Sequence, residues 1–187
     1  LRAQLDACFE DFRIGAVKLG MLASAEVIDC VADALQTHRP PHVVLDPVMV
    51  ATSGAKLLED EALHALRTRL LPLASIVTPN IPEAELLTGI RIDNAAAAAA
   101  AIDALRAMGA PAVLLKGGHL HEGDVVVDRY DDGQTQAECV HRRLSLDAHG
   151  TGCTLASAIA ANLCLDLPLV AAVNAATDYI ERALRGG

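Results

Sequence analysis

The sequence predicts one α/β domain, a three-layer α/β/α sandwich with a mostly parallel sheet and a late antiparallel hairpin. Short apolar runs alternate with longer amphipathic stretches, which is the pattern of parallel strands joined by crossover helices. The chain has 187 residues, of which 52% are hydrophobic, and this is enough to bury one sizeable core. Over residues 124–144 the pattern changes to the alternation that is typical of a hairpin.

The first half of the chain alternates apolar runs with amphipathic stretches. Strands are predicted over residues 14–22, 42–46 and 74–80, and helices over residues 24–39 and 59–71. In the first of these helices, Ile28, Val31 and Leu35 recur at the spacing of one buried face. Ser24 precedes the helix and is placed to act as its N-cap. These segments form two strand–helix units followed by a third strand.

The second half continues this alternation and then departs from it. Helices are predicted over residues 82–89, 94–109, 152–163 and 167–184, with a fourth parallel strand over 111–118 and a hairpin over 124–144. Asn94 is placed to cap the alanine-rich helix, and Asp132-Gly133 is a strong turn signal within the hairpin. Neither an internal repeat nor a linker divides the chain, so residues 1–187 are predicted to form a single domain.

Charge and composition argue against several classes of function. Fifteen Lys and Arg against 24 Asp and Glu give a net charge of −9 without a basic stripe, so nucleic acid is not expected as a partner. The sequence has no apolar run of about 20 residues that would predict a membrane span. Five cysteines without a Cys-x-x-Cys pair argue against a disulfide scaffold or a structural zinc site. The expected location is therefore the cytoplasm.

A glycine-rich stretch runs into a long apolar helix over residues 144–163, LSLDAHGTGCTLASAIAANL. Gly150 and Gly152 leave the backbone N–H groups around Thr151 free of side-chain obstruction, and the helix dipole favours an anion at this end. A phosphate group is the expected anion. Glycines before a helix also serve ordinary tight turns, so this stretch alone is compatible with a structural role.

Cys153 lies in the first turn of that helix. A thiol at a helix N-terminus has a pKa below its usual value of about 8.5, which predicts that Cys153 acts as a base or nucleophile near neutral pH. The alternative is that Cys153 is a small buried hydrophobic residue, as free cysteines usually are. The remaining cysteines are interpreted as packing residues: Cys8, Cys30, Cys139 and Cys164.

Three polar residues fall at the carboxyl ends of predicted parallel strands, the edge where open α/β sheets bind their ligands. Asp46 ends one strand, and Asn80 and Glu83 follow the next. Mg²⁺ takes oxygen ligands and usually keeps several waters, so one or two carboxylates beside substrate phosphates suffice. Each residue alone is equally explained as a cap or turn residue. Together they predict a metal and phosphate site.

Lys116 ends the fourth predicted strand and is followed by two glycines that allow the backbone to approach a ligand closely. An ammonium group there can meet a nucleotide phosphate as a compact point charge. His119, His121 and His149 raise the question of a zinc site, but no paired spacing with carboxylates or cysteines supports one.

Five segments in this order resemble one family over nearly the whole chain. They read VKLGML, VVLDPVMVATSGAKLL, VTPNIPEAELLTG, LLKGGH and HGTGCTLASAIAA, and they are similar to the hydroxymethylpyrimidine and phosphomethylpyrimidine kinases of thiamine biosynthesis. The resemblance implies a ribokinase-like fold and the cofactors ATP and Mg²⁺. It implies phosphorylation of 4-amino-5-hydroxymethyl-2-methylpyrimidine and then of its monophosphate, which yields the pyrophosphate.

The resemblance also implies roles for residues of the glycine-rich stretch. Gly150, Thr151, Gly152 and Cys153 match the anion hole that holds the transferring phosphate. Most ribokinase relatives carry an aspartate general base at the position of Cys153, so here the implied base is a thiol. Asp147 matches an earlier acid of the same motif.

Roles are implied for the other edge residues as well. Asp46, Asn80 and Glu83 match the magnesium and phosphate region, with Asp46 and Glu83 as metal ligands that act largely through water. Lys116 matches a residue near the ATP phosphates. The residues that match positions around the pyrimidine pocket are Met21, Val48 and Met49.

The departures from the family pattern lie at the two ends. A strand with a Gly-Gly-Ala-Gly segment and a glutamine that reads the pyrimidine edge do not precede Leu1, and a Gly-Pro-containing tail does not follow Gly187. The resemblance therefore implies a domain that is incomplete at both ends, either as a fragment of a longer gene product or as a truncated relative. The alternative functions are a cysteine-containing pyridoxal kinase and a non-catalytic nucleotide-binding relative. A homodimer is the expected assembly.

Overall fold

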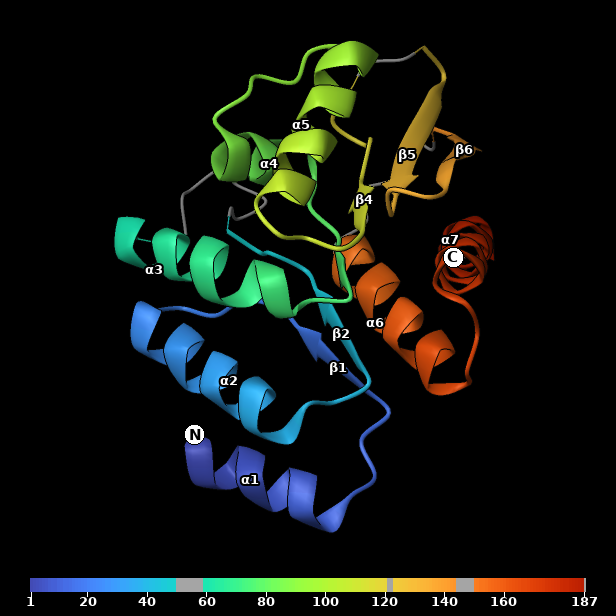
Figure 1. Cartoon of the computed structure of the whole chain (residues 1–187). Helices are drawn as coiled ribbons and strands as arrows, with labels where there is room; N and C mark the ends of the chain where they lie inside the picture. Colours follow the sequence, from blue (N-terminus) through green and yellow to red (C-terminus); the bar gives the residue numbers. More distant parts are fainter. Residues whose placement is uncertain (50–58, 121–122, 144–149, 187) are drawn as a thin grey trace.

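The computed structural model describes residues 1–49, 59–120, 123–143 and 150–186. One six-stranded sheet runs through the molecule in the order β1-β2-β3-β4-β5-β6 (Figure 1). The strands are β1 (Ala16–Leu19), β2 (His42–Leu45), β3 (Ile76–Val77), β4 (Val113–Leu115), β5 (Val125–Asp131) and β6 (Gln136–Arg142). The helices are α1 (Arg2–Asp11), α2 (Ala25–His38), α3 (Asp60–Ala65), α4 (Ile81–Thr88), α5 (Ala95–Ala107), α6 (Thr151–Cys164) and α7 (Leu169–Gly186).

The connections explain why the helices form two layers. Strands β1 to β4 are parallel and lie side by side in sequence order, whereas β5 and β6 are antiparallel. Successive parallel strands that step in one direction, with right-handed crossovers, place their connecting helices on the same face of the sheet. Helices α2 to α5 lie on this face, and α6 and α7 lie on the other (Figure 1). The predicted sandwich with its late hairpin is confirmed.

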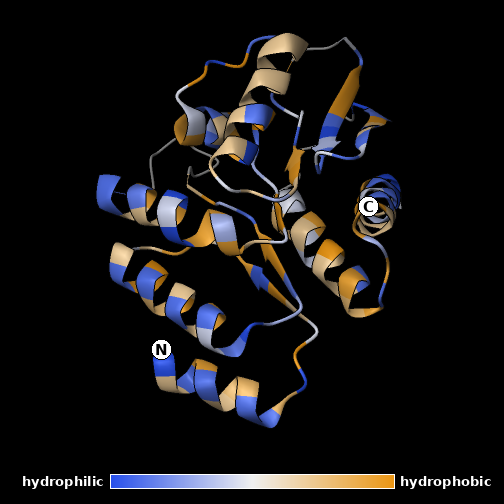
Figure 2. Cartoon of the chain, viewed as in Figure 1, coloured by the Kyte–Doolittle hydropathy of each residue, from blue (hydrophilic) through white to orange (hydrophobic). Residues whose placement is uncertain are grey.

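The alternation of side chains along the strands supplies both layers of the core. Val43 and Val77, at odd positions, lie in the core cluster beneath α2 to α5. Val44, Ile76 and Leu114, at even positions, lie in the second cluster beneath α6 and α7. Hydrophobic strands are therefore covered on both faces, as Figure 2 shows in the middle of the molecule.

The ends of α2, α4 and α5 follow from capping residues that the sequence predicts. The side chains of Ser24 and Asn94 accept hydrogen bonds from backbone N–H groups in the first turns of α2 and α5. Gly89 ends α4 with φ of 75°, the left-handed conformation that glycine adopts without a steric penalty. The hairpin also forms as predicted, with Asp132 accepting from the N–H groups of Gln134 and Thr135.

The structure differs from the prediction in three respects. The parallel strands are shorter than the apolar runs that contain them. The helix predicted over residues 59–71 is α3 continued by a π-helical turn, η1 (Leu66–Leu70), and a 3₁₀ turn, η2 (Leu71–Leu73). Pro72 lacks a backbone N–H and cannot continue an α-helix, which accounts for the tighter last turn. Helix α1 was not predicted.

Helix α1 has no buried residue, so no apolar stripe marks it in the sequence. Polar and aromatic contacts hold it against α2. Arg2 donates to the Thr37 hydroxyl of α2 at 3.1 Å, Asp6 lies 2.6 Å from Nε2 of His38, and the rings of Phe9 and His38 stack with centroids 4.4 Å apart. Such contacts join side chains from separate helices and leave no periodic signal.

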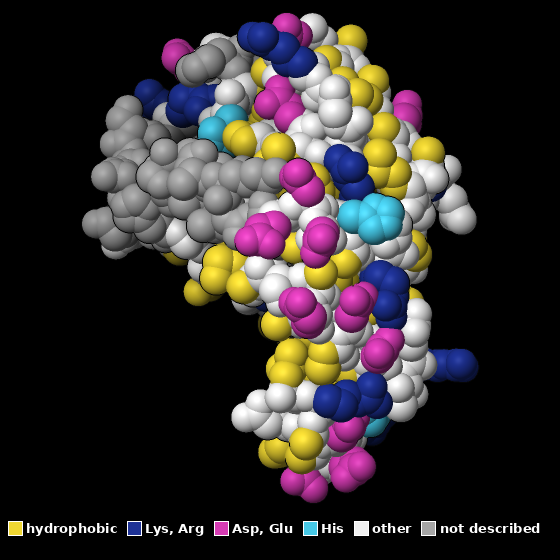
Figure 3. Space-filling view, turned by 90° about the vertical axis from the view of Figure 1, so that its left-hand side faces the viewer, with side chains coloured by type: hydrophobic (Ala, Val, Ile, Leu, Met, Phe, Trp, Pro, Cys, Tyr) yellow, Lys and Arg dark blue, Asp and Glu magenta, His cyan; other side chains and the backbone are white. Residues whose placement is uncertain are grey.

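The surface fits the charge balance of the sequence. On the face shown in Figure 3, acidic side chains are mixed with Lys and Arg among the described residues. The Lys and Arg side chains of this face do not form a continuous stripe. Elsewhere among the described residues, Arg69 pairs with Asp29 and Asp33 at 2.7 and 2.6 Å. Within the described ranges, every helix is too short or too polar to cross a bilayer. All five cysteines are free thiols.

Candidate functional site

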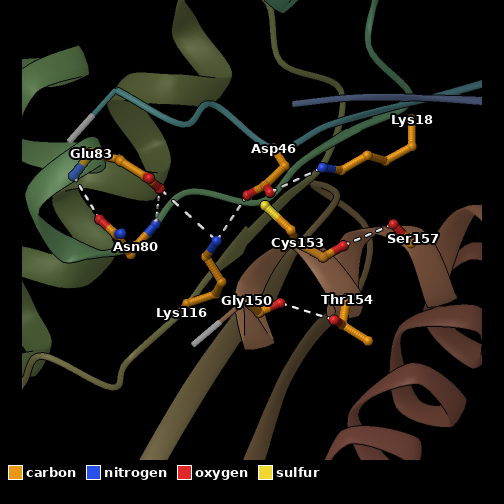
Figure 4. A network of polar contacts seen from close by, with 9 residues as sticks. All are labelled: Lys18, Asp46, Asn80, Glu83, Lys116, Gly150, Cys153, Thr154 and Ser157. Carbon is orange, nitrogen blue, oxygen red and sulfur yellow. Dashed lines mark hydrogen bonds and ion pairs between the residues drawn. The ribbon is translucent and has the colours of Figure 1, made fainter. Parts of the chain in front are cut away.

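The even-numbered face of the sheet becomes polar at the carboxyl ends of the parallel strands. Along each of the four parallel strands, an apolar side chain of this face is followed two residues later by a polar one. We call these residues the polar layer: Lys18, Asp46, Thr78 and Lys116. Asp46 is 1% exposed and Thr78 is fully buried. The first turn of α6 lies against this layer, so strand alternation and one helix end together build the site (Figure 4).

Asp46 is the centre of the polar layer because it is paired with a lysine on each side. Lys116 Nζ donates to Oδ1 of Asp46 at 3.0 Å, and Lys18 Nζ lies 3.4 Å from Oδ2 (Figure 4). Burial by itself would raise the pKa of Asp46. The charge of Lys116, a hydrogen bond from the Cys153 thiol and the charge of Lys18 outweigh burial and hold this pKa below its usual value. Asp46 is therefore a carboxylate at neutral pH.

Asn80 and Glu83 form a capping box at the start of α4. Asn80 Oδ1 accepts from the N–H of Glu83 at 2.9 Å, and Glu83 Oε2 accepts from the N–H of Asn80 at 2.7 Å. The same Oε2 lies 3.9 Å from Lys116 Nζ. Glu83 is 3% exposed, and this burial raises its pKa more than Lys116 and the Asn80 N–H lower it. Asn80 and Glu83 thus cap the helix and also lie beside Lys116. The interpretation as a helix cap and the interpretation as part of a metal and phosphate site are therefore compatible.

The N-terminus of α6 faces Lys116 in the polar layer. Gly150 is the N-cap and has φ of 77°, a left-handed conformation that favours glycine. Gly152 lies in the first turn, and a Cβ added to it would be 2.9 Å from Lys116 Nζ. The first-turn N–H groups have no acceptor within the helix. Backbone donors and an ammonium group therefore converge on one place, as the glycine-rich stretch predicts.

Cys153 lies beside Asp46, and the expected direction of its pKa is wrong. The residue is exposed on α6, but its sulfur points to the Asp46 carboxylate (Figure 4). Desolvation of the thiol, its hydrogen bond to Asp46 and the negative charge of Asp46 raise the pKa of Cys153, although Lys18 and Lys116 act in the opposite direction. A full charge in contact outweighs the half-charge of a helix end. Cys153 is thus a thiol at neutral pH.

A cleft of about 490 Å³ opens from the Lys116 side of the polar layer. It runs between the β5–β6 hairpin and the helices α6 and α7. Its volume is in the range of small-molecule sites. The lining combines polar and apolar side chains, among them Lys116, His119, Asp128, His141, Leu155 and Ile180. A ligand with one charged and one apolar end fits such a lining.

Asp128 fixes one wall of this cleft. Its Oδ1 accepts from the N–H of Gly117 at 2.7 Å, and its Oδ2 lies 4.0 Å from Nε2 of His141. Burial raises the pKa of Asp128. Gly117 is needed here because a Cβ would collide with the carbonyl oxygen of Val127. The backbone after Lys116 is thus held tightly against the hairpin.

The three residues expected around the pyrimidine differ in exposure, and three other predicted residues lie outside the described part of the chain. Met21 is 58% exposed, Val48 is half-buried, and Met49 is 1% exposed and packs in the core beneath α2 to α5. The backbone N–H of Met49 donates to the Glu83 carboxylate. Their assignment to a pyrimidine pocket stays a prediction. Asp147, His121 and His149 lie outside the described residues.

Two members of the polar layer were missed from the sequence. Lys18 stands inside an apolar strand and Thr78 follows one. Both lie in segments that carry the family resemblance, but neither was assigned a role in the site. The signal that identifies them is the shared even position, because period-2 alternation places Lys18, Thr78 and Asp46 on one face. The buried hydroxyl of Thr78 has no hydrogen-bond partner among the described residues.

Comparison with known proteins gives consistent matches over this chain. The family model described as phosphomethylpyrimidine kinase matches residues 1–187. The chain is 48% identical over 182 residues to the thiamine biosynthesis bifunctional protein ThiED of Geobacter sulfurreducens, covering 97% of this chain and 37% of that protein. It is 46% identical over 184 residues to a hydroxymethylpyrimidine/phosphomethylpyrimidine kinase of Rhizobium meliloti, covering 97% of this chain and 68% of that one.

A solved structure resembles the fold as well. It is the pyridoxal kinase from Staphylococcus aureus in complex with AMP-PCP and pyridoxal, with a TM-score of 0.89 and 30% sequence identity. The similarity covers 99% of this chain and 66% of that chain. Both the sheet and its helical layers are therefore shared with that structure.

Proposed function

The chain belongs to the phosphomethylpyrimidine kinase family, and from this premise we propose that it phosphorylates 4-amino-5-hydroxymethyl-2-methylpyrimidine and then its monophosphate, using ATP, in thiamine biosynthesis. The ribokinase-like fold that the sequence predicts agrees with this assignment. The observation that carries the proposal is the buried Asp46 between two lysines, facing the N-terminus of α6. Phosphoryl transfer depends mainly on alignment and charge neutralisation, which this arrangement supplies.

We place the donor nucleotide in the cleft beside Lys116. The cleft ends at the first turn of α6, where the N–H groups around Gly152 and the Lys116 ammonium converge. Anionic phosphates are stabilised at such a helix end. The apolar lining, which includes Leu155 and Ile180, suits the nucleoside end of ATP. The similar pyridoxal kinase structure contains AMP-PCP, which supports a nucleotide donor.

The chemistry of the donor set fits Mg²⁺. Asp46 and Glu83 offer hard carboxylate oxygens, and both are buried next to Lys116. Within the described residues, His, Cys, Asp and Glu do not gather in a group of three that could cage a metal. Mg²⁺ commonly uses one or two carboxylates together with substrate phosphates and waters, so Asp46 and Glu83 would hold it through water. When bound, the ion would neutralise phosphate charge.

The chain's own residues then position the acceptor and manage its proton. In the first transfer the substrate hydroxyl oxygen bonds to the γ-phosphorus while the bond to the leaving phosphate oxygen breaks. The hydroxyl proton has to leave, and the proposed acceptor is the sulfur of Cys153, as the thiolate. Because Asp46 and desolvation raise the pKa of Cys153, only a small fraction of the protein carries this thiolate at neutral pH. Lys18 and Lys116 offset part of that cost.

A pyridoxal kinase is the second candidate function. The observation that favours it is the TM-score of 0.89 to the Staphylococcus aureus enzyme. Sequence identity favours the pyrimidine, because it is 46% to the Rhizobium meliloti kinase and 30% to the pyridoxal kinase. The non-catalytic alternative has no support from the site, since the charged groups that phosphoryl transfer requires are present.

One assay separates the three functions. The protein is incubated with ATP, Mg²⁺ and either hydroxymethylpyrimidine or pyridoxal, and phosphorylated products are followed by mass spectrometry. We expect a pyrimidine monophosphate followed by a pyrophosphate, with a higher kcat/KM than for pyridoxal. Turnover of pyridoxal alone would assign the second function. Bound ATP without any product would leave a nucleotide-binding protein.

The proposed assembly is a homodimer. Apolar side chains that stay exposed on the described surface, such as Phe12 and Met21, support it. A mass in light scattering that is twice that of the 19.5 kDa chain is the expected result. A monomer mass over a wide concentration range would refute the dimer.

A further inference from the structure

Lys18 is the lysine of the polar layer that lies outside the proposed nucleotide cleft. Its ammonium lies 3.4 Å from Oδ2 of Asp46, while Lys116 occupies Oδ1 at 3.0 Å. Lys116 lines the cleft and Lys18 does not. The two lysines therefore approach one carboxylate from opposite sides, as Figure 4 shows. Only the Lys116 side faces the proposed nucleotide.

The surroundings of Lys18 leave its charge available. Its side chain is 21% exposed, and Asp46 is its one ion-pair partner among the described residues. At 3.4 Å this pair is longer than a charge-assisted hydrogen bond, so the three N–H donors of the ammonium are not committed. A Cβ added to Gly20 would lie 2.9 Å from Lys18 Nζ. The ammonium thus lies against the backbone next to Met21, a residue expected around the pyrimidine.

The two proposed transfers make different demands on such a charge. The first acceptor is a neutral hydroxyl group, whereas the second is a phosphate monoester with a charge near −2. This dianion has to approach the γ-phosphate of ATP, and the repulsion requires a cation that the donor does not already use. Lys116 lies against α6 and faces the donor, so Lys18 is the lysine of the polar layer that is left for the acceptor.

We propose that Lys18 binds the phosphate group of the monophosphorylated pyrimidine and so determines the second transfer. The inference rests on the proposed function and adds a residue and a ligand group to it. Asp46 keeps the ammonium directed at the place where Cys153 and the acceptor meet. In the second transfer an acceptor phosphate oxygen bonds to the γ-phosphorus as ADP leaves, and Lys18 offsets the charge of the remaining acceptor oxygens.

The test compares the two transfers within single protein preparations. Wild type, Lys18→Met and Lys18→Arg are assayed with ATP and Mg²⁺ on hydroxymethylpyrimidine and on its monophosphate. Loss of one charged hydrogen-bonding partner predicts that Lys18→Met lowers the ratio of second to first kcat/KM by about 10- to 100-fold. Lys18→Arg keeps the charge and should retain most of the ratio. Because each ratio comes from one preparation, a partly unfolded variant does not distort it.

Lys116→Met is the matched control, since it removes the other lysine of the same carboxylate. It should lower both transfers together and leave their ratio unchanged. An unchanged ratio in Lys18→Met would overturn the inference, and so would a fall in that ratio for Lys116→Met of the same size.

A binding measurement decides the inference even without turnover. In calorimetry without nucleotide, the monophosphate should bind wild type and Lys18→Arg more tightly than Lys18→Met. The dissociation constant should differ by about 10- to 100-fold, which corresponds to the loss of one charged hydrogen bond. Hydroxymethylpyrimidine should bind all three proteins alike. Equal binding of the monophosphate to all three would reject Lys18 as its phosphate ligand. Absent turnover in wild type together with this binding pattern would instead reject only the proposed kinase activity.

Discussion

Asp46 shows how much of the site depends on a single buried side chain. A carboxylate that is 1% exposed requires compensation, and three groups provide it: Lys116 directly after β4, Lys18 in β1 and the Cys153 thiol in α6. These contacts also align the three groups, because each contacts the same Asp46 carboxylate. Charge, alignment and the acceptor-side thiol are thus consequences of one residue at the end of β2.

The raised pKa of Cys153 predicts an unusual pH dependence. If the thiolate accepts the hydroxyl proton, the first transfer should accelerate with pH through about pH 9, because the thiolate fraction rises until pH exceeds the raised pKa. Cys153→Ala should slow this transfer by about two to four orders of magnitude at high pH. The measurement is kcat for hydroxymethylpyrimidine as a function of pH.

Cys153→Asp is the matched control for this profile. A carboxyl group ionises at much lower pH than a thiol, so the rise in rate should move to lower pH and leave a plateau at neutral pH. A wild-type profile that is flat between about pH 6 and pH 9, with Cys153→Ala as fast as wild type, would remove Cys153 from proton transfer.

At the scale of elements, α4 links fold stability to the site. The capping box of Asn80 and Glu83 starts the helix and also fixes the carboxylate that lies 3.9 Å from Lys116. The β-bridge between Asn80 and Lys116 connects the same residues through the backbone. The helix start and the proposed metal side of the site are therefore expected to respond together to one substitution.

Asn80→Ala tests this link. Removing the N-cap should lower the free energy of unfolding by about 1 kcal/mol, because the N–H of Glu83 loses its acceptor. It should also weaken Mg²⁺-dependent nucleotide binding, since Glu83 is less well fixed. Asn80→Asp retains an oxygen acceptor and should keep most of the stability. Chemical denaturation and nucleotide titration measure the two effects, and an unchanged denaturation midpoint in Asn80→Ala would refute the capping role.

The sequence predicts regular elements well and the relations between them poorly. Ser24, Asn80 and Asn94 act within a few residues of the chain, so their caps are visible in the sequence. The contact of Cys153 with Asp46 joins distant segments, and it reverses the pKa direction that the helix position alone implies. The role of Lys18 was not predicted either, because it depends on Asp46, which follows another strand.

At the scale of the molecule, one sheet carries two cores. The cluster beneath α2 to α5 and the cluster beneath α6 and α7 share strands β2 to β4, whose side chains alternate between them. If either helical layer separated from the sheet, the apolar face that it covers on these shared strands would be exposed to water. The two layers should therefore unfold as a unit, which is our expectation for a single domain.

Matched substitutions in the two cores test this unity. Ile28 and Ile159 are both fully buried, one in each cluster. Ile28→Val and Ile159→Val should each lower the free energy of unfolding by about 1 kcal/mol, because each deletes one buried methyl group. Each should leave one cooperative transition in denaturant. Two transitions, with each variant shifting only one of them, would show that the layers unfold separately.

The central claim is that phosphoryl transfer takes place where the polar layer meets the N-terminus of α6. A crystal structure of the protein with a non-hydrolysable ATP analogue and Mg²⁺ tests it most directly. We predict that the γ-phosphate lies within hydrogen-bonding distance of the Gly152 and Cys153 N–H groups and of Lys116 Nζ, with the nucleoside in the cleft beside the hairpin. Phosphates bound elsewhere, with Lys116 still paired only to Asp46 and Glu83, would contradict the account.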